Sequence, residues 1–109
     1  MRKVKVYRNS KFAGELIQEN TKSYVFRYDD SYYSNDSLPA ISLTLPKSQQ
    51  IYKSEFLFPF FFNMLSEGVN RKLQSRQLKI DEKDYFALLM ETAKYDTIGA
   101  IIIKPDKEL

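Results

Sequence analysis

The segment from Phe56 to Leu65 constrains the fold most, because eight of its ten residues are large and apolar. A chain of 109 residues has room for one hydrophobic core, so the sequence predicts a single domain over residues 1–109. Pro59 suits the first position of a helix, and a helix is expected over 59–66. A helix in so small a domain normally keeps one face in water. A segment that is apolar on all sides must therefore be buried by other residues of the domain or by another protein.

Helical spacing divides this segment into two faces. The face expected to meet the core carries Phe60, Phe61, Met64 and Leu65. Phe62 and Asn63 point away from that face on the helical wheel. Either other parts of the domain or a second protein then covers Phe62, since phenylalanine is typical of both cores and interfaces. The residues alone leave these two alternatives open.

Alternation of apolar and polar residues predicts four strands in the first half of the chain. Two form a hairpin over 4–18, the third runs over 21–28, and the fourth is expected over 41–45 between Pro39 and Pro46. The acid-rich stretch 29–37 has the composition of turns. It lacks the ligand spacing and the glycine of a calcium-binding EF-hand loop, so no metal site is expected there.

The second half has helical periodicity and ends in a strand. Besides the helix over 59–66, which Gly68 should end, helices are expected over 69–78 and 82–94. Asp81 should cap the last helix, with Asp84 at the capping-box position. The apolar run 98–103 predicts a strand that returns to the sheet. The fold class is therefore α+β, with an antiparallel or mixed sheet of about five strands and three short helices.

The residue inventory excludes many kinds of catalysis. The chain has no cysteine and no histidine, so thiolate chemistry, disulfides, His-based triads and His-ligated metals are ruled out. Three widely spaced glycines form neither a Walker A motif nor a dinucleotide fingerprint. Carboxylate pairs such as Asp29 with Asp30 are better explained as turn and helix-end residues. We expect no catalytic residues, no cofactor and no enzymatic activity.

Charge and hydropathy point to a cytoplasmic protein without membrane contact. The net charge is +3, the N-terminus lacks the apolar region of a signal peptide, and no apolar run spans a bilayer. A basic strip on the helix over 69–78 could bind nucleic acid through phosphates, and it consists of Arg71, Lys72, Arg76 and Lys79. A solvated helix face has the same composition, and no nucleic-acid-binding motif accompanies the strip. Direct nucleic-acid binding is therefore the alternative and not the expectation.

Three motifs, in order and in register, resemble the N-terminal subdomain of HipA-type serine/threonine kinase toxins. Residues 59–68, PFFFNMLSEG, followed by Arg71, resemble the family's "PFF-x-NLLPEG…R" signature, with Ser66 in place of the usual proline. Residues 41–46, ISLTLP, are similar to its "LSLSLP" strand. Residues 84–89 and 96–100 resemble its "D-x-F-x-LL…D-x-x-GA" ending, with 93–95 where a glycine-containing turn is common. The resemblance covers about residues 3–105.

The resemblance implies a regulatory role. Full-length family kinases continue into the lobes that hold ATP, so a chain of 109 residues resembles the stand-alone, HipS-like subunit of split HipBST-type toxin–antitoxin modules. The implied partner is a HipA/HipT-like kinase toxin, with a HipB-like helix-turn-helix protein joining through the complex, and the implied role is that of an antitoxin. An orphan protein-interaction domain is the other alternative. The segment 56–71 is the expected contact with the partner, and the contact residues expected within it are Phe58, Phe62, Asn63, Ser66, Glu67 and Arg71.

Overall fold

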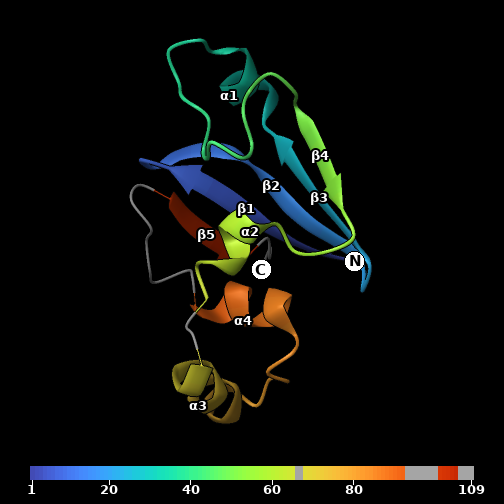
Figure 1. Ribbon diagram of the computed structural model, residues 1–109. Helices are drawn as coiled ribbons and strands as arrows, with labels where there is room; N and C mark the ends of the chain where they lie inside the picture. The colour runs from blue at the N-terminus through green and yellow to red at the C-terminus, as the bar shows by residue number, and fades with distance from the viewer. Residues whose placement is uncertain (66–67, 93–100, 106–109) are drawn as a thin grey trace.

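The computed structural model describes residues 1–65, 68–92 and 101–105, and it has the predicted α+β architecture (Figure 1). Its sheet consists of β1 (Arg2–Arg8), β2 (Lys11–Asn20), β3 (Ser23–Tyr28), β4 (Ile51–Ser54) and β5 (Ile101–Pro105). The strand order is β4-β3-β2-β1-β5, and every pairing is antiparallel. The helices are α1 (Asp30–Ser34), α2 (Pro59–Phe62), α3 (Gly68–Leu78) and α4 (Tyr85–Thr92).

Three helices cover one face of the sheet. Ring contacts join α1 to β3 through Tyr32 and Tyr28 at 6.0 Å, and α2 to β3 through Phe61 and Phe26 at 5.7 Å. A third contact, Phe86 to Tyr24 at 6.5 Å, places α4 on the same face. Helix α3 lies beyond α4, away from the sheet (Figure 1). The core therefore sits between the sheet and α1, α2 and α4.

The strand predicted over 41–45 is wrong. Ile41 and Leu45 are buried, but Leu43 between them is 99% exposed, and the segment is a loop. A strand would have turned all three side chains to the same face. The Tyr28 hydroxyl holds the loop by accepting a hydrogen bond from the Ile41 N–H at 3.1 Å and donating one to the Leu45 carbonyl. The fourth strand of the chain is instead β4, which pairs with β3.

Several predicted helix boundaries also differ. Helix α1 occupies part of the stretch read as turns, because the Asp29 carboxylate accepts hydrogen bonds from the Ser31 and Tyr32 N–H groups at its start. Helix α2 is shorter than predicted, and Gly68 begins α3 instead of ending the preceding helix. Asp84, not Asp81, caps α4 by accepting a hydrogen bond from the Ala87 N–H at 3.2 Å.

The closing strand does return to the sheet. Strand β5 pairs with β1 at the edge of the sheet, with Ile101 and Ile103 buried on the core face. Residues 98–100 of the predicted strand lie outside the described residues. The longest described helix is α3 at 11 residues, and no described helix is long and apolar enough to cross a membrane.

Candidate partner-binding cleft

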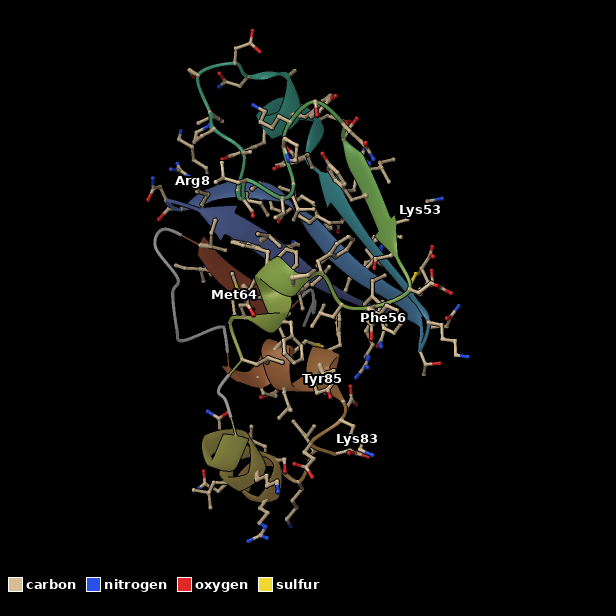
Figure 2. All side chains as sticks on the ribbon, viewed as in Figure 1. Arg8, Lys53, Phe56, Met64, Lys83 and Tyr85 are labelled. Atoms are coloured by element: carbon tan, nitrogen blue, oxygen red, sulfur yellow. The ribbon has the colours of Figure 1, made fainter. Side chains whose placement is uncertain are left out.

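A cleft of about 520 Å³ opens where the β2–β3 turn, the segment after β4 and the start of α4 meet. Its lining is mainly apolar and comes from Tyr24, Phe56, Leu57, Phe62 and Tyr85. Figure 2 shows Tyr85 below α2 and Phe56 beside α2, near the end of β4. The cleft thus joins the aromatic segment singled out by the sequence to a second element, α4.

Phe62 forms the inner wall of this cleft. Its ring meets the ring of Tyr85 edge to face, with centroids 5.0 Å apart and planes at 83°. This geometry places the positive edge of one ring against the negative face of the other and contributes roughly 0.5–1.5 kcal/mol beyond the area buried. Phe62 is therefore half-buried by its own domain. The rest of its surface stays open to a second protein, so each of the two alternatives left by the sequence accounts for part of the side chain.

Phe56 is the exposed aromatic of the cleft. Its side chain is 76% exposed, although the residue is fixed in place by a hydrogen bond from its N–H to the Ser54 hydroxyl at 3.1 Å. The sequence prediction included Phe56 in the contact segment 56–71 but did not name it among the individual contact residues. The available signal was its position before Pro59 and outside the predicted helix, where no periodicity assigns it to the core. A phenylalanine this exposed is characteristic of an interaction surface when it borders an apolar hollow.

Charged side chains surround the apolar lining. Lys22 and Lys83 contribute two cations to the wall, and Glu55 contributes one carboxylate. An apolar centre with charged residues around it has the composition of a protein–protein contact.

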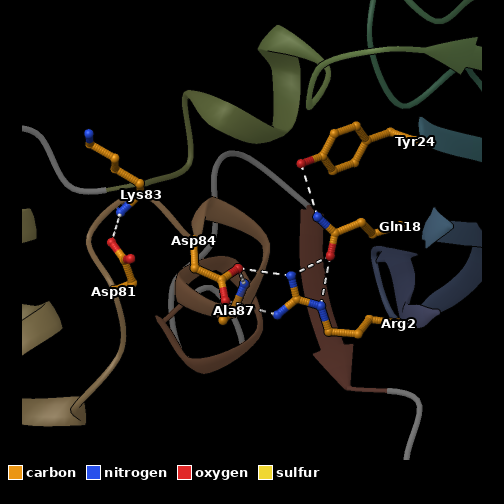
Figure 3. Close-up of polar contacts among 7 residues, drawn as sticks. All are labelled: Arg2, Gln18, Tyr24, Asp81, Lys83, Asp84 and Ala87. Atoms are coloured by element: carbon orange, nitrogen blue, oxygen red, sulfur yellow. Dashed lines mark hydrogen bonds and ion pairs between the residues drawn. The ribbon is translucent and has the colours of Figure 1, made fainter. Parts of the chain in front are cut away.

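A polar network holds the wall of the cleft in place (Figure 3). The Gln18 amide donates to the Tyr24 hydroxyl at 3.1 Å, and its carbonyl oxygen accepts from Arg2 Nε at 2.7 Å. Arg2 in turn donates to both carboxylate oxygens of Asp84. These bonds, led by the side-chain hydrogen bond from Arg2, hold the pKa of Asp84 below its ordinary value. The network links β1, β2 and β3 to the start of α4, and thereby fixes Tyr24 relative to Tyr85.

The predicted partner-binding residues are not gathered in one place. Phe58 is only 8% exposed and packs against Phe61 at 6.4 Å, so most of its surface belongs to the core. Asn63 is exposed at the end of α2. Ser66 and Glu67 lie outside the described residues, as does the side chain of Arg71, which belongs to α3. The structure brings Phe62 together with two residues that the prediction omitted, Phe56 and Tyr85.

The basic strip of α3 forms a separate surface. Lys72, Arg76 and Lys79 are exposed and line a second hollow of about 530 Å³, together with Asp81 and Glu82. The two carboxylates offset part of the positive charge that a phosphate backbone would require. This mixed composition favours the solvated-face interpretation of the strip.

Comparisons with known proteins agree with the motifs. The profile described as HipA N-terminal domain matches residues 4–104. A solved structure, "N-terminal domain of HipA toxin", has the same fold, with a TM-score of 0.72 at 24% identity over 100% of this chain and 96% of that one. An uncharacterized protein of Haemophilus influenzae is 30% identical over 108 residues, which are 99% of this chain and 96% of that protein.

A longer relative sets the domain in context. "Putative kinase Y4mE" of Sinorhizobium fredii is 23% identical over 108 residues, and the chain spans 26% of its length. The matched region is an N-terminal domain and not a kinase domain. Because the profile covers nearly the whole chain and the Haemophilus relative matches it end to end, the chain belongs to the HipA N-terminal domain family.

Proposed function

We propose that this chain is a non-catalytic regulatory subunit, an antitoxin, that binds a HipA-like serine/threonine kinase toxin in trans. Membership of the HipA N-terminal domain family implies a role related to toxin–antitoxin systems. The observation that carries the proposal is the pair of relatives. The same 108 residues account for 96% of a Haemophilus protein and for 26% of a much longer one named as a kinase. A domain that occurs both as a separate protein and as part of a longer kinase can bind in trans the kinase surface that it contacts in cis.

The cleft supplies a surface for that contact. Its exposed Phe56 and half-covered Phe62 provide apolar area, and the Arg2–Asp84 network fixes the surrounding elements before a partner arrives. Preorganised surfaces bind more tightly because less conformational entropy is lost on association. Asn63 lies next to Phe62 and can supply a polar contact.

The test first asks whether a HipA-like kinase is encoded beside this chain's gene, and then titrates that purified kinase with the chain calorimetrically. Phe56→Ala should weaken binding about 30-fold, since truncating an interface aromatic costs roughly 2 kcal/mol. Its unfolding temperature should match that of the wild type, because the side chain is 76% exposed. Leu43→Ala is the matched control, as Leu43 is a large, 99% exposed apolar residue outside the cleft. Equal affinities for the two variants would remove the cleft from the interface.

The non-catalytic part of the proposal has its own assay. The chain alone should neither bind ATP nor incorporate labelled phosphate, since its sequence provides no phosphate loop. The kinase should be phosphorylated and toxic without the chain and be neutralised with it. Phosphate transfer by the isolated chain, or an absence of any complex with the kinase, would contradict the proposal.

A further inference from the structure

The face of the sheet opposite the core carries no described helix. The ring contacts of α1, α2 and α4 all lie on the other face, and α3 lies away from the sheet. Side chains on this open face come from the alternate positions of each strand. They are mostly half-buried or exposed, and they combine basic residues with a few apolar ones and with Glu15 and Glu19 of β2.

The strand register arranges four of these residues in one row across the sheet. Lys3 of β1 lies opposite Ile17 of β2, Ile17 opposite Val25 of β3, and Val25 opposite Lys53 of β4. The row is therefore an apolar pair with a lysine at each end. Three strand spacings separate the two lysine positions, which is roughly 14 Å. Neither lysine forms an ion pair with another described residue.

The neighbouring row differs because it contains a carboxylate. Lys5, Glu15 and Arg27 lie opposite one another on β1, β2 and β3, so a carboxylate sits between two cations. Arg27 also forms an ion pair with Asp30 at 2.7 Å. Opposite charges that face each other across strands largely satisfy one another. The same row continues to Lys104 of β5, which lies opposite Lys5 and stands over the Tyr7 ring at 5.0 Å. The Lys3–Lys53 row differs from it in having cations on both sides of an apolar pair and no carboxylate within the row.

We infer that the open face binds an acidic protein segment through this row. The complementary segment carries one large apolar side chain between two carboxylates about 14 Å apart. The apolar side chain would rest on Ile17, the more exposed member of the apolar pair, and each carboxylate would pair with one lysine. An extended segment meets this spacing when its acidic residues are four positions apart, because four residues span roughly 13 Å and alternate side chains point the same way.

A nucleic acid fits this face less well. A phosphate backbone needs closely spaced cations, whereas here an apolar pair separates Lys3 from Lys53 and Glu15 lies in the adjacent row. Ile17 is half-buried and Val25 is only 7% exposed, so the apolar surface between the two lysines is shallow and belongs mainly to Ile17. Charge at the rim with apolar contact at the centre matches a protein partner.

The experiment needs no kinase, so its failure is separate from a failure of the proposed function. The probe is a synthetic peptide with one leucine between two glutamates, each two residues away, and the control peptide has lysine in place of glutamate. Backbone amide shifts of the labelled protein are followed during titration. The glutamate peptide should shift β1 to β4 residues of the row, including Ile17 and Val25, and the lysine peptide should not.

Charge reversal locates the binding site. Lys3→Glu with Lys53→Glu should weaken peptide binding at least about tenfold. Lys72→Glu with Arg76→Glu, which changes the net charge equally on α3, should change it less than about threefold. Lys3→Gln with Lys53→Gln repeats the test if the reversed pair does not fold. Absence of shifts at millimolar peptide, equal loss in both pairs, or tighter binding of a 20-nucleotide single-stranded DNA at the same residues would overturn the inference.

Discussion

Arg2 and Asp84 form a two-pronged contact across 82 positions of sequence, with guanidinium nitrogens 2.8 and 3.2 Å from the two carboxylate oxygens. The same carboxylate accepts the Ala87 N–H that would otherwise be unpaired at the start of α4. One side chain therefore caps a helix and fastens it to β1. Since both partners are about one-third exposed, the ion pair itself contributes modestly, and the cap adds to it.

Asp84→Ala should lower the free energy of unfolding by about 1–2 kcal/mol, because it removes both the cap and the Arg2 contact. Asp84→Asn keeps a capping oxygen and should cost less. Asp81→Ala is the control, since Asp81 accepts only the Lys83 N–H in an exposed turn. Urea denaturation measures all three, and an equal cost for Asp81→Ala and Asp84→Ala would show that the contact to Arg2 is without effect.

Acid should selectively remove the contribution of Asp84. Hydrogen bonding from Arg2 lowers the folded-state pKa of this carboxyl, so folding favours its charged form. The resulting stability is fully present above the unfolded-state pKa of about 3.9 and is lost as pH falls through the lower, folded-state pKa. The stability difference between wild type and Asp84→Asn should therefore be constant from about pH 5 to 7 and shrink below about pH 4. A difference that grows on acidification would contradict this assignment.

The hairpin and the third strand could be predicted because their apolar alternation reflects how they are buried, and the closing strand because its apolar run is buried at Ile101 and Ile103. Helix α3 could be predicted from helical spacing, although Leu73 of its expected apolar stripe is 49% exposed. The segment 41–45 shows where periodicity misleads. Ile41 and Leu45 are buried although they belong to a loop, which the distant Tyr28 hydroxyl holds against the core. Such a tertiary contact leaves no signal in the local sequence. Strand β4, in contrast, is a strand that the apolar pattern did not predict. It has four residues at a sheet edge, alternately exposed and half-buried, and carries little apolar pattern.

The Tyr28 hydroxyl provides a direct test of that loop anchor. Tyr28→Phe should cost about 1–3 kcal/mol, because it leaves the buried Ile41 N–H and Leu45 carbonyl without their partner. Tyr52→Phe is the control, as its hydroxyl donates to the Pro46 carbonyl where solvent can replace it. Thermal unfolding of both variants measures the difference, and equal shifts in the two would rule out a special role for Tyr28.

Alkaline titration should show the burial of Tyr28 directly. Burial raises the pKa of this hydroxyl to about 12, above the value of about 10 in an unfolded chain. Folding therefore favours the protonated form, and the stability it contributes is complete below pH 10 and lost as pH rises towards 12. Burial also raises the pKa of Tyr32, so ultraviolet difference absorbance should show fewer tyrosines titrating between pH 10 and 11 in the native protein than in denaturant. Tyr28→Phe should reduce that difference, and an unchanged difference would contradict the burial of Tyr28.

The cleft was only partly predictable, for a reason that concerns Phe62 and Tyr85. A helical wheel reports which side of α2 a residue occupies, but not which element stands opposite. The edge-to-face contact comes from α4, more than 20 positions away, so it could not be inferred from the spacing within 56–65. Phe56 was overlooked because an apolar residue in an apolar run is assumed to be buried. Its exposure follows from the turn fixed by Ser54.

Gly14 should tolerate no side chain, because β2 passes β3 too closely at this point. A Cβ there would overlap the Arg27 carbonyl oxygen and lie 3.0 Å from the Tyr28 Cα, and neither backbone atom can move without disturbing the sheet. Gly14→Ala should therefore lower the free energy of unfolding by about 2 kcal/mol or more, although alanine inside a strand is normally more favourable than glycine. Glu15→Ala, on the open face of the same strand, should stay within about 1 kcal/mol of wild type. If chemical denaturation ranks the two variants the other way, the close approach of β2 and β3 at Gly14 is relieved in solution.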